Sequence, residues 1–157
     1  MEVPLKKLQN TNKTGTKVIF KPDEQIFSTT HFSFTTICER MQECAFLLKG
    51  LTIEVNDALN DKHELFHYEN GLEAFVEYIN DDKDTLHNVV HFEGIKDRIN
   101  VEVAFQYTES YSENILSFVN NVKTNDGGTH EVGFKTAITR IFNDYAKNNN
   151  YFKAKDK

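Results

Sequence analysis

The chain has 157 residues, of which 39% are hydrophobic and 27% are charged, and its net charge is −6. This length suits one full domain or one partial domain joined to another, and the composition is that of a soluble protein with a packed core. No apolar run approaches the roughly 20 residues that span a bilayer, and residues 1–7 do not lead into the apolar stretch of a secretory signal. We therefore expect a cytoplasmic protein, and its negative charge argues against a dedicated nucleic-acid binder.

The elements predicted in the first part of the chain are a strand over 16–21, a helix over 34–49 and a strand over 51–55. The Thr-x-x-Glu spacing of Thr36 and Glu39 is typical of a capping box at a helix start. The apolar residues of this helix share one face: Ile37, Met41, Cys44, Ala45 and Leu48. Cys38 and Cys44 point to different faces and are interpreted as buried reduced thiols. The polar residues 56–62 are the best candidate for a domain boundary.

The second part is predicted to hold a short strand over 66–68, a helix over 71–79, a turn over 81–84, strands over 89–92, 99–107 and 115–122, and a helix from Thr129. The Thr129 hydroxyl is expected to cap the free amides of the last helix, and Glu131 suits its dipole. Its apolar face comprises Phe134, Ala137, Ile138, Ile141, Phe142 and Tyr145. The pattern indicates an α+β fold, with several strands in one sheet and helices on one side.

One motif suggests zinc chemistry, because His63, Glu64 and His67 match the His-Glu-x-x-His pattern of zinc hydrolases. That chemistry needs both histidines on one face of a helix, where they bind zinc while the glutamate activates water. Here polar turn residues precede the motif, and residues 66–68 favour a strand. A chance match within a strand is the preferred interpretation, and we expect no metal site. A zinc hydrolase is the rival that stoichiometric bound zinc would revive.

The glycine pair Gly127-Gly128 opens the last predicted helix, so its amides could hold a phosphate or another anion. A tight strand-to-helix turn is favoured, because glycine adopts backbone angles that other residues resist and the Gly-Lys-Ser/Thr ending of a Walker loop is lacking. On the polar side of that helix, Lys135, Arg140 and Lys147 form either a solvated face, the usual case, or a surface that meets DNA phosphates.

Several segments together resemble the ATPase subunit of bacterial type IIA DNA topoisomerases, from about Lys13 to Tyr145. Residues 14–23 resemble the last strand segment of the GHKL-type ATP-binding fold, and residues 40–51 resemble the helix-to-strand segment after it. Residues 67–72, 106–107 and 117–145 are similar to its transducer domain. The runs Ala-Phe-Leu-Leu-Lys-Gly, Ser-Phe-Val-Asn-Asn-Val and His-Glu-Val-Gly-Phe-Lys-Thr-Ala resemble topoisomerase IV more than gyrase.

The resemblance implies a chain in two parts. Residues 1–62 would be the C-terminal part of a GHKL ATP-binding domain. Residues 63–157 would be a transducer domain of ribosomal-protein-S5-domain-2-like fold, incomplete at its C-terminus. The chain would then be an internal fragment of the B subunit of topoisomerase IV, an ATP-hydrolysing isomerase that couples ATP use to DNA strand passage and decatenates chromosomes. A fragment of gyrase B and a non-catalytic clamp or interaction module are the alternatives.

The resemblance also implies roles for single residues. Thr16 matches a threonine close to the adenine pocket, and Arg140 matches an arginine that faces the cavity for transported DNA. The signature turn, expected to serve structural coupling, comprises Gly127, Gly128, Thr129 and His130. No catalytic residue is carried over, because the family's catalytic glutamate and magnesium-binding asparagine would precede this chain.

The implied cofactors are ATP and Mg²⁺ for the parent enzyme, with no strong binding expected of this chain. Without a base that orients water or a magnesium ligand, the chain by itself is predicted neither to hydrolyse ATP nor to relax DNA. The implied partners are DNA, the A subunit of topoisomerase IV and a second copy of the ATPase subunit, with which the parent dimerises through its ATPase domain. No membrane partner is expected.

Overall fold

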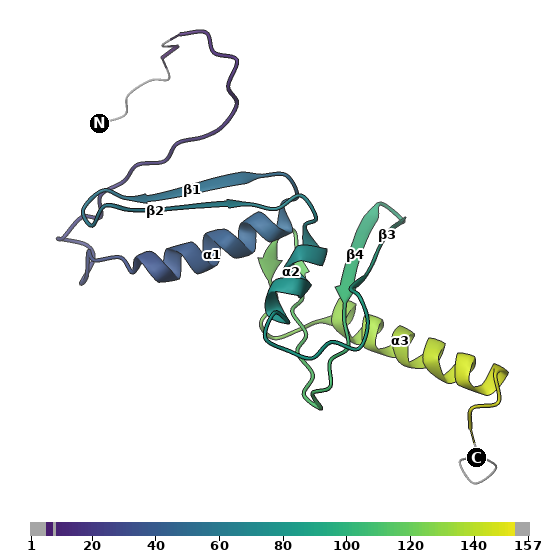
Figure 1. Ribbon diagram of the computed structural model, residues 1–157. Helices are drawn as coiled ribbons and strands as arrows, with labels where there is room; N and C mark the ends of the chain where they lie inside the picture. Colours follow the sequence, from purple (N-terminus) through teal and green to yellow (C-terminus); the bar gives the residue numbers. More distant parts are fainter. Residues whose placement is uncertain (1–5, 8, 153–157) are drawn as a thin grey trace. The chain divides into compact units, whose positions relative to one another are not determined.

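The structure, a computed structural model, describes residues 6, 7 and 9–152 (Figure 1). The expectation about a secretory signal rests on residues 1–7 and falls mostly outside the described residues. Contacts within the chain divide it into two units, Met1–Ser33 and Phe34–Lys157. Among the described residues, no helix combines the length and the apolar character that a membrane span needs.

The described residues of the first unit contain no helix and no strand. The strand predicted over 16–21 is therefore wrong: the segment is unpaired, and Val18 and Ile19 are 75% and 83% exposed. A β-strand requires a neighbour that completes its backbone hydrogen bonds, and no described segment of this unit supplies one. Within the unit, the ring of Phe20 lies edge-on against Phe32, with centroids 5.4 Å apart.

The second unit begins with α1 (Phe34–Leu47), which packs on the hairpin of β1 (Thr52–Asp57) and β2 (Lys62–His67) (Figure 1). The predicted helix over 34–49, the strand over 51–55 and the strand at 66–68 are confirmed, with bounds shifted by a few residues. The capping box is wrong. Because α1 starts at Phe34, Thr36 lies inside the first turn and Ser33 occupies the cap position.

The polar residues predicted as a domain boundary form the end and the turn of the β1–β2 hairpin. The Asp57 carboxylate accepts the backbone N–H of Leu59 at 3.0 Å and the side-chain amide of Asn60 at 2.7 Å. These hydrogen bonds, that of the Asn60 side chain first, lower the pKa of Asp57. Contacts in the chain divide after Ser33 rather than at residue 62. The assignment of 1–62 and 63–157 to two domains stays a prediction.

The remaining elements are α2 (Leu72–Ile79), β3 (Val90–Lys96), β4 (Ile99–Phe105), β5 (Phe118–Val119), β6 (Val122–Lys123) and α3 (Thr129–Asn148). The predicted helices over 71–79 and from Thr129 are confirmed, as are the strands over 89–92 and 99–107. The expectation of several strands in one sheet is wrong for the described residues, whose strands form three separate two-stranded antiparallel sheets. The mixed α+β character is confirmed.

The strand predicted over 115–122 is instead a hairpin. Phe118 pairs with Lys123, and Val119 pairs with Val122. Asn120 and Asn121 lie between them at φ 50° and 64°. A two-residue turn with two positive φ angles matches the twist of antiparallel strands, and asparagine adopts such angles more readily than most residues. Two asparagines therefore reverse the chain within what looks like one apolar run.

Aromatic rings dominate the small core. Among the described residues the buried hydrophobic ones are Ala45, Phe46, Phe66 and Phe75. The ring of Phe46 stacks on Tyr68 at 3.7 Å and on Phe75 at 4.9 Å, between centroids. Phe75 also contacts Phe118 at 6.4 Å, so β5 joins this cluster. Of the face predicted for α1, Ala45 is buried as expected whereas Leu48 is 40% exposed.

Candidate functional site

The turn before α3 is built on the two glycines. Gly127 has φ 69°, in the left-handed region that favours glycine, and Gly128 is extended with φ 161°. The N–H of Gly127 donates to the Thr124 carbonyl at 2.9 Å. Thr129 is the first helical residue, and Gly128 occupies the cap position without a side-chain cap. The prediction that Thr129 caps this helix is therefore wrong, while Glu131 does lie in the first turn.

The glycines also leave space for two polar side chains. A Cβ atom at Gly128 would lie 2.8 Å from Nδ1 of His130. A Cβ atom at Gly127 would lie 3.1 Å from Oε2 of Glu131. The first of these distances is too short for any real contact, so a side chain at Gly128 would displace the imidazole. The turn is tight because side chains of the first helical turn fold back over it.

Polar side chains connect this turn to the β5–β6 hairpin. Ser117 and Thr124, at the two ends of that hairpin, approach at 2.6 Å between hydroxyl oxygens. Nε2 of His130 lies 3.1 Å from the Thr124 hydroxyl. The Ser117 hydroxyl donates to Oε2 of Glu131 at 3.2 Å. The start of α3 is thus hydrogen-bonded to both ends of the hairpin by its own side chains.

A chain of ion pairs continues from Glu131 along the helix. Its Oε1 lies 3.3 Å from Nζ of Lys135, and the same ammonium group lies 2.7 Å from Oε1 of Glu113. The hydrogen bonds to Glu113 and then Glu131 raise the pKa of Lys135. Glu113 belongs to the polar link between β4 and β5, so these contacts bring a third segment to the start of α3.

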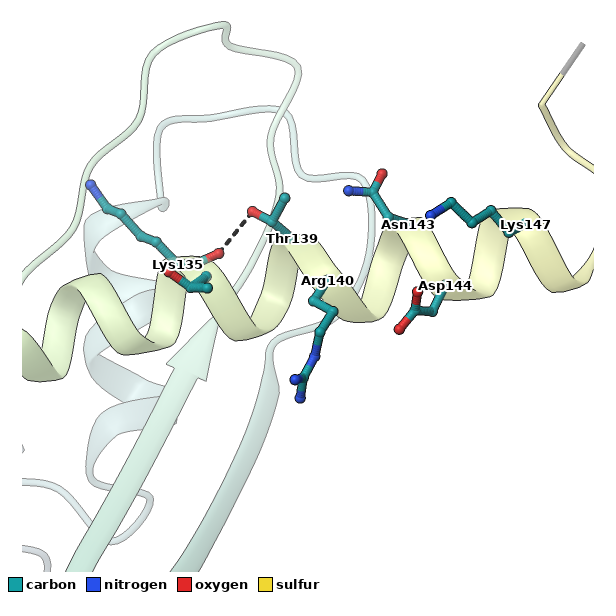
Figure 2. Close-up of a pocket in the computed structure, with 7 residues that line it drawn as sticks. Lys135, Thr139, Arg140, Asn143, Asp144 and Lys147 are labelled. Carbon is teal, nitrogen blue, oxygen red and sulfur yellow. Dashed lines mark hydrogen bonds between the residues drawn. The ribbon is translucent and has the colours of Figure 1, made fainter. Parts of the chain in front are cut away.

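Polar side chains of α3 lie along an open stretch of the helix surface (Figure 2). They are Lys135, Thr136, Thr139, Arg140, Asn143, Asp144 and Lys147. Lys135 and Arg140 nevertheless project to opposite sides of the helix in Figure 2. At 3.6 residues per turn these two positions are about 140° apart, whereas Arg140 and Lys147 differ by about 20°. Only Arg140 and Lys147 therefore share a cationic stripe, and the described residues give neither an ion pair.

The zinc-like motif lies in β2, as the strand interpretation predicted. Residues four apart in a strand share a face but stand about 13 Å apart, too far for one ion. His63 contacts Glu54 at 3.2 Å, and His67 contacts Thr52 at 3.0 Å. No group of three histidine, cysteine or acidic side chains among the described residues is placed to hold a metal.

Thr16 lies in the unpaired first unit, exposed and without a hydrogen bond to any described residue. One exposed hydroxyl offers neither a pocket for adenine nor ligands for an ion. Thr16 by itself therefore does not form a binding site that fits ATP or Mg²⁺. The role of Thr16 stays a prediction.

The residues that sequence patterns did not reveal are Ser117, Thr124 and Glu113. Ser117 and Thr124 flank the Asn-Asn turn at equal distance, so recognising that hairpin would have predicted their meeting. Glu113 lies 22 positions from Lys135 along the chain, and no local pattern reveals such a pair. The two cysteines are free, as expected, but half-buried rather than buried.

Comparison with known proteins supplies the context for this turn and helix. Residues 71–157 match the family model of DNA gyrase B. The chain is 59% identical over 153 residues to the B subunit of DNA topoisomerase 4 from Bacillus subtilis, an alignment that covers 98% of this chain and 23% of that protein. It is 58% identical over 156 residues to the protein of the same name from Staphylococcus aureus, covering 98% and 24%. The chain thus spans about a quarter of the length of these relatives.

Solved structures agree in fold. The 43K ATPase domain of Thermus thermophilus gyrase B, solved with an aminocoumarin, superposes with a TM-score of 0.75 at 34% identity, covering 86% of this chain and 37% of that one. The B-subunit of the DNA gyrase from Myxococcus xanthus gives 0.69 at 29% identity, covering 74% and 34%. These matches confirm the resemblance read from the sequence. Because the family model matches more than half of its residues, the chain belongs to the DNA gyrase B family.

Proposed function

We propose that the chain is part of a type IIA DNA topoisomerase, namely of the B subunit of topoisomerase IV, which couples ATP binding and hydrolysis to DNA strand passage. One observation carries this proposal: identity of 58–59% over nearly the whole chain to proteins named as the B subunit of DNA topoisomerase 4. The two gyrase B structures stand lower, at 34% and 29%. The parent would be a cytoplasmic, ATP-hydrolysing isomerase that changes DNA topology and decatenates chromosomes.

The two parts of the chain would then have different roles. Residues 1–62 would form the C-terminal part of a GHKL-type ATP-binding domain. Residues 63–157 would belong to the transducer domain, of ribosomal-protein-S5-domain-2-like fold. The family match, which begins at residue 71, supports the second assignment. In this arrangement the Gly127-Gly128 turn joins the β5–β6 hairpin to α3 and serves structural coupling rather than chemistry.

The DNA-facing element would be the polar side of α3. Arg140 and Lys147 share a stripe there and have no ion pair among the described residues, so their charges are free to meet phosphates. Lys135 forms ion pairs with two carboxylates, so its charge is not available to bind phosphates. The proposed partners of the parent are DNA, the A subunit of topoisomerase IV and a second copy of the ATPase subunit.

Nucleotide chemistry would require more than these residues. ATP and Mg²⁺ are the proposed cofactors of the parent, with Thr16 near the adenine. Because no residue of this chain is assigned as a base that orients water or as a magnesium ligand, we expect the purified 157-residue chain to show no ATP turnover and no relaxation of supercoiled DNA. Turnover that copurifies with the chain through successive columns would contradict this expectation.

A segment exchange tests the proposal directly. The chain replaces the matching 153-residue segment in the B subunit of Bacillus subtilis DNA topoisomerase 4, and the chimera is assayed with the A subunit of the same organism for ATP-dependent decatenation. We expect activity, because the exchanged segments are 59% identical. Arg140→Ala in the chimera should lower decatenation while DNA-independent ATP hydrolysis persists. Arg98→Gln, which removes an exposed charge at the β3–β4 turn, is the matched control.

The alternatives predict different outcomes of the same exchange. A folded chimera that hydrolyses ATP yet passes no DNA would refute the topoisomerase IV assignment. A chimera that is inactive while the free chain copurifies with the intact relative would favour a non-catalytic interaction module. Activity that is regained only when the chain is placed in gyrase B would favour gyrase.

A further inference from the structure

The attachment of α3 depends unusually little on buried apolar surface. None of its twenty residues, all of which the structure describes, is buried. Its ring contacts with earlier parts of the chain are Phe134 with Phe105 and Phe142 with Tyr107, with centroids 6.4 Å and 6.3 Å apart. Phe142 remains 52% exposed. Loose ring contacts of this kind leave the tilt of a helix poorly determined, so its direction must come from other contacts.

Glu131 supplies such contacts with both of its oxygen atoms. One oxygen accepts the Ser117 hydroxyl at 3.2 Å, and the other pairs with Lys135 at 3.3 Å. The carboxylate is only 22% exposed, in contrast to the 67% of Glu113 at the far end of the chain of contacts. One side chain therefore ties α3 to the β5–β6 hairpin and, through Lys135, to the link before it.

The glycine pair is an independent indication that the backbone is shaped to accommodate the Glu131 carboxylate. The position of a Cβ at Gly127 is 3.1 Å from Oε2 of Glu131, so the backbone leaves room for the oxygen that meets Ser117. His130 fills the equivalent space at Gly128 and approaches Thr124. The turn, the hairpin ends and the first turn of α3 thus form one contiguous set of contacts.

Because α3 is long, a small change in its direction at the first turn moves its far end by several ångströms. Lys147 lies sixteen positions after Glu131, which is about 24 Å along a helix. A tilt of about 10° at the first turn would move that end by roughly 4 Å, more than the reach of a hydrogen bond to phosphate. A contact at the start of the helix therefore decides where its cationic stripe points.

We propose that Glu131 is a positioning residue, which with Ser117 and Lys135 fixes the direction of α3 and thereby the presentation of Arg140 and Lys147. Lys135 acts as a strut, by which we mean an ionic link between Glu131 and Glu113, and does not contact DNA. The part of this inference that concerns DNA rests on the proposed function, whereas the part that concerns the helix direction does not.

The test measures the direction of α3 in the full chain. Spin labels are attached to cysteines introduced by Lys123→Cys on β6 and Asn143→Cys on α3, in a background that carries Cys38→Ser and Cys44→Ala. Pulsed electron paramagnetic resonance then gives the distribution of distances between the two labels. We expect a narrow distribution that Glu131→Gln broadens or shifts by several ångströms. Asp144→Asn, which removes a carboxylate from the same helix outside this set of contacts, should leave it unchanged.

A role in stability alone is distinguished by the same samples. If Glu131→Gln lowers the urea midpoint but leaves the distance distribution of the folded chain narrow and unshifted, the positioning role is refuted. Lys135→Met should reproduce the broadening because it removes the strut, and an unchanged distribution in both variants would also refute the proposal.

Binding to a 20-base-pair duplex, followed by fluorescence anisotropy across salt concentrations, addresses the part that involves DNA. Arg140→Ala should reduce the slope of log K against log salt by about one, and Lys135→Met should change the slope no more than Glu131→Gln does, because both act only through the direction of α3. A larger loss of slope in Lys135→Met than in Glu131→Gln would show that Lys135 itself contacts DNA and would refute the strut. If the chain binds no duplex while Glu131→Gln broadens the distance distribution, the positioning role stands and the proposed DNA-facing function falls.

Discussion

At the scale of single residues, one glycine of this chain adopts backbone angles that favour glycine, whereas another lies in a helix where alanine would be more stable. Gly71, which precedes α2, has φ 55° and ψ −120° and lies buried beside the Phe46 carbonyl. Gly133 lies inside α3 with open space around it. We expect Gly71→Ala to lower the free energy of unfolding by about 1–3 kcal/mol, because an L-residue is strained at those angles. Gly133→Ala should raise it by about 0.5–1 kcal/mol, because alanine loses less entropy in a helix.

Urea unfolding of the two glycine variants and the parent chain, followed by circular dichroism, measures both changes. The two substitutions add the same methyl group, so any general effect of added volume cancels in the comparison. Equal destabilisation by both would show that the backbone angles of Gly71 do not limit this position.

A second residue-scale prediction concerns the half-buried thiol of Cys38. Burial, followed by the charge of Glu64, raises its pKa. A raised pKa keeps the thiol protonated, so at a given pH the folded chain holds less reactive thiolate than the unfolded chain. The folded state then binds more protons above the unfolded pKa, and stability is lost as the pH rises through the folded pKa.

Alkylation of Cys38 by iodoacetamide, measured against pH in a Cys44→Ala background, tests the direction of this shift. The midpoint of the native chain should lie at higher pH than that of the chain in guanidinium. Glu64→Gln should bring the native midpoint part of the way down, whereas Glu77→Gln on α2 should not move it. A native midpoint at or below the denatured one would contradict the shift.

At the scale of elements, the local repeat of apolar residues predicts where the helices lie, but it does not predict which segments pair as β-strands. The apolar faces of α1 and α2 repeat every three or four residues, and both helices lie where that repeat predicts them. Residues 16–21 carry the composition of a strand, yet a strand exists only where a second segment completes its hydrogen bonds. The run 115–122 contains a hairpin, because Asn120 and Asn121 form a turn within a segment whose apolar composition predicts one continuous strand.

The candidate site shows the same division between local and non-local information. The Gly127-Gly128 turn and the start of α3 follow from short-range preferences, and both were found in the sequence. The helical angle between Lys135 and Arg140 is also local and would have separated them. The contacts of Glu131 with Ser117 and of Lys135 with Glu113 join positions 14 and 22 residues apart, and only the folded chain reveals them.

At the scale of the whole molecule, the described residues expose many large apolar side chains. They include Ile99 on β4 and Ile141 and Tyr145 on α3, at 65%, 62% and 59%. Exposed apolar side chains of this kind bind hydrophobic dyes and promote association.

We therefore expect the chain to bind the dye ANS in its native state and to self-associate as its concentration rises. Ile141→Glu, on the exposed apolar face of α3, should lower both the dye fluorescence and the sedimentation coefficient at high concentration, because a charge there breaks the apolar stripe. Asn143→Glu adds the same charge to the polar face and is the matched control, with helix content of both variants checked by circular dichroism. Equal effects of the two substitutions would mean that added negative charge, and not this face of α3, governs the association.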